Sequence, residues 1–467
     1  MKKRQGRFLV YLFLCCSLIS WTGPVWALTL KDAISIAVKD NPSIKALEED
    51  VGVKELDKKS AFAAMLPTIN ISYGYLKMNK AQGYETNESY LPVVDEQKPP
   101  YYNGDLDTNL FLDSTNAKPV YAYMPAQTME FSHKDNYDFK VEVMQPIFAG
   151  GALFNAYRIA DNTMQTANLE QLKGIREIKL KVIQTYYGVI QANQVHEVAQ
   201  SSVSSIKEHL GIAQALFDQG MIPKNDLLEA QVRYAEGLQN RIKAKNACRL
   251  AASGLNILLA RNLGAPVDLD IRIPMKRVEK TIEECTYTAM ANRQELKTLA
   301  IQLDSAQKGL KIANAAFIPQ VGASYSYEKK GEKARLEEDA TWQAGLGMTW
   351  EIFKGGSHFY DRSKTRRVIL QTGYIIQAQR DQIALEVKNA YLSADEAMAR
   401  TKVSAKSIDQ AKEHLRIQKD RYNLQVATSS EVLDAEALLT QAETNYISAK
   451  IDYAKAVEEL KAAMGTL

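Results

Sequence analysis

The sequence is poor in cysteine and has no long hydrophobic segment beyond its N-terminus. Only four cysteines occur in 467 residues, which excludes a small disulfide-stapled scaffold. Cys248 and Cys285 lie on different expected helices, and their spacing leaves both a disulfide and two free thiols possible. After residue 27 no run of about eighteen apolar residues occurs, so we expect no helix that crosses a bilayer.

The usual patterns of catalytic, metal and phosphate sites are also lacking. No Ser/His/Asp set is suggested, and Gly150-Gly151 is not followed by the Lys-Ser or Lys-Thr of a phosphate-binding loop. The five histidines do not have the spacing of metal ligands. We therefore expect no enzyme activity, no cofactor and no metal site. The histidines are His133, His196, His209, His358 and His414.

The N-terminus has the parts of a secretory signal peptide. Four basic residues precede an apolar run from Phe8 to Ile19, and Val25-Trp26-Ala27 forms a cleavage site. We predict a signal peptide over residues 1–27, which holds four of the 58 basic residues and none of the 55 acidic ones. The mature chain is then nearly neutral, so we expect no nucleic-acid partner.

Proline is absent from residues 152–219, and this absence permits a helix about 100 Å long. Apolar residues recur in it at alternating spacings of three and four, which indicates a coiled-coil seam. These residues are Ala199, Val203, Ile206, Leu210, Ala213 and Phe217. The last helix has a similar seam, at Leu439, Ala442, Tyr446, Ala449, Tyr453, Ala456, Leu460 and Ala463. Such helices are too long for an ordinary globular domain.

The same arrangement occurs twice along the chain. Residues 137–151 return as residues 342–356 at an offset of 205, and residues 63–75 return as 315–327 at an offset of 252. We predict a first repeat over 28–277 and a second over 278–467, each with a helix, two strands and a helical hairpin. The first has strands at about 68–78 and 137–146, a long Tyr-rich and Pro-rich surface loop at 80–136, a hairpin at 152–262 and a linker at 263–277. The second has strands at about 320–328 and 341–352 and a hairpin at 357–465.

The predicted strands alternate between apolar and polar side chains. Tyr137, Phe139 and Val141 share one face of their strand, whereas Asp138 and Lys140 share the other. In a secreted chain such strands indicate an outer-membrane β-barrel, because only closed sheets satisfy strand backbones in lipid. Four strands cannot close alone, so we expect identical subunits to share the barrel. A small soluble sandwich under a helical bundle is the alternative.

Proline and glycine mark the places where strands meet helices. Proline ends a strand ladder, and glycine accepts unusual backbone angles. We therefore predict strand–helix junctions at Pro67, Pro146, Gly150, Gly151, Pro319, Gly355 and Gly356.

Three short motifs accompany the tandem halves: Asn41-Pro42, Gln145-Pro-Ile-Phe-Ala-Gly-Gly151 and a pair of related tip motifs. The tip motifs are Phe217-Asp-Gln-Gly220 with Asp226-Leu-Leu-Glu-Ala230, and Tyr422-Asn-Leu-Gln425 with Glu431-Val-Leu-Asp-Ala435. With these motifs and the tandem halves, the whole mature chain resembles the TolC family of outer-membrane efflux and secretion ducts. The fold that this resemblance implies is an α+β membrane protein: a homotrimer whose outer-membrane β-barrel takes four strands from each subunit and continues into a periplasmic α-helical coiled-coil barrel.

The resemblance also implies a function and partners. The chain would be the duct of a tripartite efflux pump or a type I secretion system, conducting substrates passively to the cell exterior. Its partners would be outer-membrane lipid, a periplasmic adaptor, and an inner-membrane pump of the RND, ABC or MFS type. The alternatives are a periplasmic adaptor or a structural coiled-coil envelope protein. The amphipathic strands disfavour both.

The resemblance places a gate at the turns farthest from the membrane. Glu431 and Asp434 fall where family members have rings of acidic residues that narrow the aperture, and Glu229 matches Asp434 at the offset of 205. Asp226 and Tyr422 fall where a hydrogen-bonded latch holds the gate shut. This chain departs from the family pattern with Gln425 in place of a glycine and Ala427 in place of an arginine. Thr428-Ser-Ser-Glu431 is also the pattern of a capping box, so capping is an alternative role for Glu431.

Overall fold

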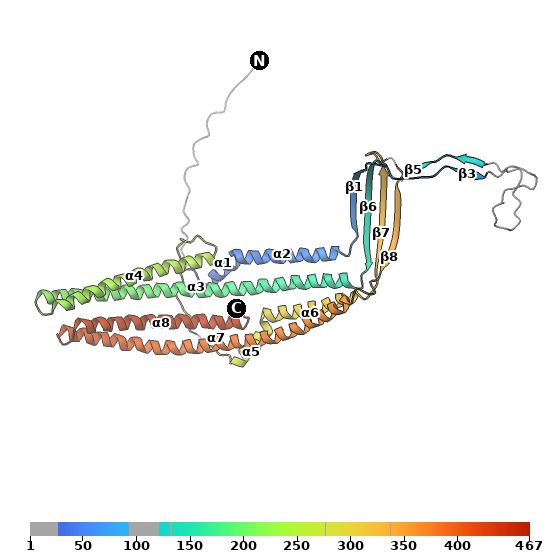
Figure 1. Cartoon of the computed structure of the whole chain (residues 1–467). Helices are drawn as coiled ribbons and strands as arrows, with labels where there is room; N and C mark the ends of the chain where they lie inside the picture. Colours follow the sequence, from blue (N-terminus) through green and yellow to red (C-terminus); the bar gives the residue numbers. More distant parts are fainter. Residues whose placement is uncertain (1–26, 93–120, 131–132, 276, 337) are drawn as a thin grey trace, which may run out of the picture. The chain divides into compact units, whose positions relative to one another are not determined.

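A computed structural model describes residues 27–92, 121–130, 133–275, 277–336 and 338–467 (Figure 1). The predicted signal peptide lies outside the described residues except for Ala27. The chain forms two compact units, which we describe separately. The helical unit contains residues up to Asp57, 160–306 and 367–467, and the sheet unit contains residues 58–159 and 307–366. Among the described helices, none combines the length and the apolar character needed to cross a membrane.

The sheet unit is built on a four-stranded antiparallel sheet in the order β1-β6-β7-β8. Its strands are β1 (Thr68–Lys77), β6 (Asp135–Phe148), β7 (Gln320–Gly331) and β8 (Thr341–Thr349). The central pair β6–β7 joins one strand from each predicted repeat. The four-strand sheet is confirmed, whereas the repeat boundary at residues 277 and 278 stays a prediction.

The register of the sheet gives it one apolar and one polar face. Val141 lies opposite Ile71 on one side and Tyr327 on the other, and Lys140 lies between Ser72 and Glu328. Directly opposed residues in an antiparallel sheet share a face, so the alternation predicted for single strands extends across the sheet. Apolar side chains that are more than half exposed in the single chain include Ile69, Ile71, Leu346 and Met348.

The predicted loop at residues 80–136 contains two short antiparallel ribbons. β2 (Gly83–Glu85) pairs with β5 (Thr128–Glu130), and β3 (Ser89–Pro92) pairs with β4 (Tyr121–Met124). Residues 93–120 of this segment lie outside the described part of the chain. Tyrosine favours strand pairing even where no core is buried, and this preference accounts for the ribbons.

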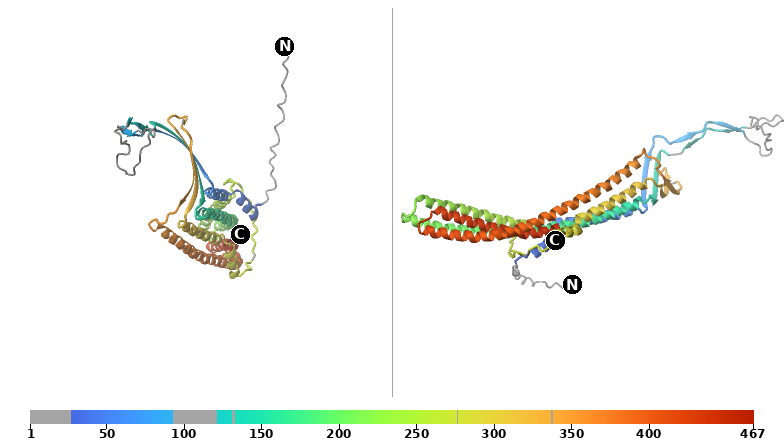
Figure 2. Two further views of the ribbon diagram at one scale, coloured as in Figure 1. Left: turned by 90° about the vertical axis from the view of Figure 1, so that its right-hand side faces the viewer. Right: turned by 90° about the horizontal axis from the view of Figure 1, so that it is seen from below.

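The helical unit contains two long hairpins, which lie side by side in Figures 1 and 2. The first is α3 (Ala152–Asp218) with α4 (Lys224–Leu258), and the second is α7 (Ser357–Asn423) with α8 (Ser429–Ala463). The leading helices have 67 residues each and the returning helices 35 each. The predicted long helices are confirmed. No seam residue predicted for α3 or α8 is exposed.

The main core of this unit surrounds the middle of α3. Side chains from α3, α4 and α8 pack there with the short helix α1 (Leu30–Asp40). Its fully buried members include Ala33, Ala37, Val182, Ile183, Ile190, Leu255 and Ile451. Cys285 is buried in a second cluster, Cys248 is half-buried, and both are free thiols.

The shorter helices break at equivalent positions in the two halves. The first half has α1 followed by α2 (Pro42–Ala63), and the second has α5 (Ile282–Asn292) followed by α6 (Gln294–Ala315). Asn41 Nδ2 donates to the Leu258 carbonyl at 3.0 Å, and Arg293 Nη1 donates to the Ala463 carbonyl at 3.2 Å. Asn41 and Arg293 are 252 residues apart, and Leu258 and Ala463 are 205 apart. Each break thus satisfies the last carbonyl of a returning helix.

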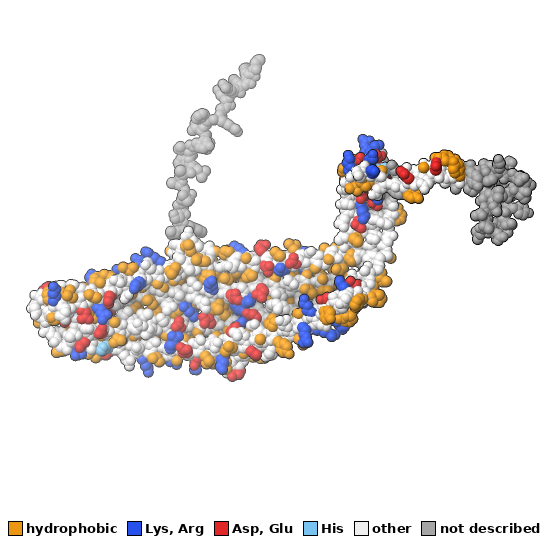
Figure 3. Space-filling model, viewed as in Figure 1, with side chains coloured by type: hydrophobic (Ala, Val, Ile, Leu, Met, Phe, Trp, Pro, Cys, Tyr) orange, Lys and Arg blue, Asp and Glu red, His pale blue; other side chains and the backbone are white. Residues whose placement is uncertain are grey.

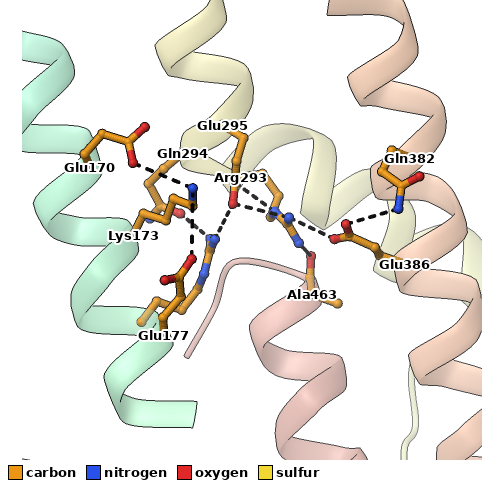
Figure 4. A network of polar contacts seen from close by, with 10 residues as sticks. Glu170, Lys173, Glu177, Arg293, Gln294, Glu295, Gln382, Glu386 and Ala463 are labelled. Carbon is orange, nitrogen blue, oxygen red and sulfur yellow. Dashed lines mark hydrogen bonds and ion pairs between the residues drawn. The ribbon is translucent and has the colours of Figure 1, made fainter. Parts of the chain in front are cut away.

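Arg293 also belongs to a buried polar network (Figure 4). Glu295 pairs with both Arg176 and Arg293, and the Arg293 Nε–Glu295 Oε2 distance is 2.9 Å. A second oxygen, Glu386 Oε2, lies 2.9 Å from Arg293 Nη2. Burial alone would raise the pKa of Glu295, but a backbone hydrogen bond and the two guanidinium groups hold it below its ordinary value. The network joins α3 and α6 through charges that are almost fully buried, and it reaches α7 through the more exposed Glu386.

Candidate functional site at the tips of the helical hairpins

The two hairpins turn with the same backbone geometry. Gly220 has φ +70° after α3, and Gln425, 205 residues later, has φ +61° after α7. The amide of Met221 donates to the Leu216 carbonyl, and that of Val426 donates to the Arg421 carbonyl, each at 2.9 Å. Both turns are therefore Schellman motifs, in which the residue after the helix is left-handed. Gln425 adopts this conformation without being glycine.

The substitution Gln425→Gly should stabilise the second turn by about 1 kcal/mol, because glycine accepts positive φ without a Cβ penalty. Gly220→Ala should destabilise the first turn by a similar amount. A Cβ at Gly220 would meet no atom within 4 Å, so the backbone conformation alone sets that cost. Hydrogen exchange of peptides spanning the two turns measures both effects. If Gln425→Gly leaves the protection of these amides from exchange unchanged, the positive φ of Gln425 does not strain the turn.

The tips of the two hairpins are packed into each other. Leu433 of α8 is buried in a cluster formed by the first hairpin, with Ala213, Leu227 and Ala230. Leu216 of α3 packs in turn against a cluster formed by the second hairpin, which contains Leu415, Tyr422, Val432 and Ala435. Each hairpin thus inserts a leucine into the apolar cluster of the other.

His209 of α3 is buried between the hairpins. Its Nε2 lies 2.8 Å from Ser429 Oγ, and its ring centroid lies 4.7 Å from that of Tyr422. Burial, and next the positive charge of Lys419, lower the pKa of His209 to about 4. The imidazole is therefore neutral at neutral pH, when it joins α3 to α7 and α8.

A second polar chain crosses the same three helices through Ser205. Its hydroxyl accepts from Lys419 Nζ at 2.9 Å and donates to Glu436 Oε2 at 2.7 Å. Burial raises the pKa of the Glu436 carboxyl. Beside these groups a small cleft of about 110 Å³ is lined by Glu208, His209, Ile212, Lys419, Tyr422 and Asn423.

Tyr422 and Asp226, the predicted latch residues, lie within electrostatic reach of each other. Burial raises the pKa of Tyr422, and the charge of Asp226 raises it further. The Tyr422 ring is buried, and its hydroxyl has no hydrogen-bond partner among the described residues. Asp226 lies in the first turn of α4, and Glu229 is half-buried one turn further on.

Glu431 and Asp434, the predicted aperture residues, are exposed at the start of α8. They are three residues apart, so they share one helix face. Glu431 lies 3.6 Å from Arg421, and Asp434 lies 3.2 Å from Arg233 of α4. The Glu431 amide donates to Thr428 Oγ1 at 3.4 Å, so Thr428 caps α8 while the Glu431 side chain lies by Arg421. Glu431 and Asp434 thus each pair with an arginine, whereas Asp226 and Tyr422 lie near each other.

The family model described as outer membrane efflux protein matches residues 33–261 and 286–466, which is most of the chain. The chain belongs to the outer membrane efflux protein family. It is 23% identical over 343 residues to the alkaline protease secretion protein AprF of Pseudomonas aeruginosa, a match that covers 71% of this chain and 70% of the relative. It is 21% identical over 301 residues to the outer membrane protein TolC of Vibrio cholerae, covering 62% of this chain and 67% of the relative.

Solved structures of outer-membrane channels share the fold of this efflux protein. The CmeC outer membrane channel of Campylobacter jejuni matches with a TM-score of 0.73 at 15% identity, over 94% of this chain and 85% of that channel. The outer membrane protein VceC of Vibrio cholerae matches with a TM-score of 0.72 at 14% identity, over 93% of this chain and 96% of that protein. The resemblance found in the sequence is thus confirmed. This efflux protein is a transport channel of the outer membrane with a periplasmic helical extension, and its family implies a trimeric assembly.

The predicted junction residues of this efflux protein lie in its sheet unit, and all except Pro146, which is inside β6, lie between a strand and a helix. Gly150 and Gly151 have φ +59° and +82°, and Gly355 and Gly356 repeat this conformation with φ +56° and +81°. A Cβ on Gly150 would also lie 3.0 Å from Ala315 Cβ. Pro67 and Pro319 precede β1 and β7, and Pro146 lies at a register shift between β6 and β7.

An equivalent side-chain hydrogen bond occurs at the strand–helix junctions of the two repeats, although the donor group differs. Gln145 Nε2 donates to the Met65 carbonyl at 2.9 Å, and Trp350 Nε1 donates to the Phe317 carbonyl at 3.2 Å. Gln145 and Trp350 are 205 residues apart, and Met65 and Phe317 are 252 apart. The repeat therefore preserves the bond although an amide is replaced by an indole.

Sequence reasoning missed the buried polar groups at the tips. His209 lies three residues after Ile206 and four before Ala213, so the seam spacing alone places a histidine on a packing face. Arg421 and Arg233 were also missed, although they supply cations beside Glu431 and Asp434 in a chain that has Ala427. In the described parts of the chain no three His, Cys, Asp or Glu side chains are placed to hold a metal ion.

Proposed function

We propose that this efflux protein is the outer-membrane duct of a tripartite efflux pump or a type I secretion system. Substrates would pass through it passively, from a periplasmic adaptor and an inner-membrane pump of the RND, ABC or MFS type to the cell exterior. The similarity to the AprF secretion protein favours a secretion role, and the match to the outer membrane efflux protein family favours an efflux role.

Three copies of the chain would close one barrel. β1 and β8 are the edges of the described sheet, and each has a hydrogen-bonded neighbour on one side only. An unpaired edge beside an exposed apolar face is unfavourable in lipid unless another strand pairs with it. Pairing of β8 with β1 of the next copy satisfies both edges. At the junctions, the left-handed glycine pairs would let the chain turn from strand to helix.

The hairpin tips would form the periplasmic gate. The observation that carries this proposal is the exposed face of α8 that holds Glu431 and Asp434 beside the interlocked turns. Of their arginine partners, Arg421 is exposed and Arg233 is half-buried, and such surface pairs contribute little stability. In a trimer these carboxylates would form rings that attract cations and oppose anions. Tyr422 and Asp226 would hold the gate shut as a latch, and Glu229, which matches Asp434, would belong to the aperture.

Single-channel conductance in planar bilayers tests the duct and its gate together. We expect the wild type to show a small, cation-selective conductance, and Glu431→Ala with Asp434→Ala to raise the conductance or reduce the selectivity. The matched control is Glu396→Ala with Asp409→Ala, which removes two exposed carboxylates from α7. It should behave as the wild type. A membrane-inserted trimer without any conductance would overturn the duct, whereas equal behaviour of both double variants would overturn only the aperture role.

A further inference from the structure

The link between β8 and the first turns of α7 carries basic residues that the first repeat lacks. Lys354, Lys364 and Arg366 correspond, at the offset of 205, to an alanine, an isoleucine and an aspartate. The lysines and the arginine are exposed. In the described chain neither Lys364 nor Arg366 has an ion-pair partner, and Lys354 pairs only with the exposed Glu351 at 3.3 Å. The positive charge of this segment is thus largely uncompensated.

Large aromatic side chains accompany these charges. Phe353, Phe359 and Tyr360 are 77%, 62% and 75% exposed, which is unusual for side chains of this size. Figure 3 shows hydrophobic side chains next to Lys and Arg side chains in the region where the helices join the strands. We name the set of Phe353, Lys354, Phe359, Tyr360, Lys364 and Arg366 the basic–aromatic patch.

The helical part of the patch faces away from α6. Thr365 marks the opposite side, because its Cγ2 lies 3.6 Å from the position of a Cβ on Gly309 of α6. At about 100° per residue, Tyr360 and Lys364 lie on one flank of the outer side and Phe359 and Arg366 on the other. The patch therefore places one aromatic and one cationic side chain on each flank of the outer side of α7.

We propose that the basic–aromatic patch binds the headgroups of anionic phospholipids in the periplasmic leaflet of the outer membrane. Aromatic side chains favour the level where acyl chains meet headgroups, and long cationic side chains reach outward to phosphate. The patch begins four residues after β8 ends at Thr349, in a protein of the outer membrane. Free phosphate would satisfy the charges and leave the aromatic rings in water, so a lipid is the occupant that matches both kinds of side chain.

The test uses the full-length trimer in nanodiscs of zwitterionic lipid with increasing phosphatidylglycerol, and native mass spectrometry counts the bound lipids. We expect the wild type to enrich phosphatidylglycerol, and the enrichment to fall by about fivefold for each charge removed in Lys354→Gln, Lys364→Gln and Arg366→Gln at low salt. It should also fall as salt is raised. The matched control is Lys243→Gln, Lys245→Gln and Arg249→Gln, which removes three exposed charges from α4.

Three results would overturn the proposal. The first is a wild-type trimer that binds phosphatidylglycerol no better than the zwitterionic lipid. The second is full competition by inorganic phosphate at the concentration of the lipid, which would reduce the patch to an anion site. The third is dissociation of the trimer in the patch variant but not in the α4 control, which would make the patch a subunit contact. The wild-type titration is informative even if the variant does not fold, and none of these results depends on the gate.

Discussion

The substitution Glu295→Gln should destabilise the helical unit by about 3–5 kcal/mol, the cost of leaving a buried charge without its partner. Arg176 and Arg293 are 7% and 8% exposed, and Glu295 pairs with both. A neutral amide keeps the shape of the side chain but leaves Arg176 without a countercharge. The expected result is a lower urea midpoint of the helical signal at 222 nm, measured on the full chain in detergent.

Two further variants separate the buried charge from the loss of packing. Glu386→Gln removes the other, more exposed carboxylate of Arg293 and should cost less than about 1 kcal/mol. Arg176→Met with Glu295→Met removes one buried charge of each sign and leaves Arg293 attached to Glu386 and to the Ala463 carbonyl. It should recover much of the loss. If this double variant is less stable than Glu295→Gln, the network acts by shape and not by charge balance.

Acidification from pH 7 to pH 5 should loosen the hairpin tips by about 2 kcal/mol, or about twentyfold in their opening equilibrium. The pKa of His209 is about 4 in the closed tip and has its ordinary value of 6.5 when the tip is open. Between these values the open state binds a proton that the closed state does not. The closed tip is therefore most stable above pH 6.5 and loses stability as pH falls toward 4. Hydrogen exchange of α3 peptides around His209, corrected for intrinsic rates, measures the change.

The polar groups around His209 come from each of the packed helices. Lys419 and Tyr422 on α7 and Ser429 on α8 lie next to it, and Glu208 on α3 lines the same cleft. Further groups act through these neighbours, because Asp226 on α4 lies near Tyr422, and Glu436 on α8 shares Ser205 with Lys419. Burial raises the pKa of Glu436, so its protonation stabilises the closed tip on acidification and opposes the effect of His209. His209→Gln keeps a hydrogen-bonding side chain for Ser429 and should abolish the loosening. Loosening of equal size in this variant would assign it to the carboxylates.

The sequence predicts the long helices and the sheet because those elements have strong periodic signals. Apolar residues recur at spacings of three and four along α8, and apolar and polar residues alternate in the four strands. Each pattern is repeated often enough to distinguish a helix from a strand. The ribbons inside residues 80–136 have strands of three and four residues and bury no core, so the only signal is the strand preference of tyrosine. That preference is weak.

The buried polar contacts at the tips could not be predicted because they depend on residues far apart in the chain. His209 and Ser429 are 220 residues apart, and Ser205 and Glu436 are 231 apart. A capping pattern is local, and the cap of α8 by Thr428 is present accordingly. The interlocked leucines, Leu216 and Leu433, determine which helices of the two hairpins face each other. The spacing of residues within one hairpin carries no information about which residues of the other hairpin these leucines contact.

The exchange of Leu216 and Leu433 between the hairpins limits how the tip can move. Either hairpin can swing outward alone only by pulling a leucine out of the other's cluster and leaving a cavity there, a loss of about 2–5 kcal/mol for each leucine. If the two hairpins move together as one rigid body, neither leucine leaves its cluster. In the proposed trimer each subunit would move its two hairpins as one unit, so the proposed aperture would widen in at most three steps, one for each subunit.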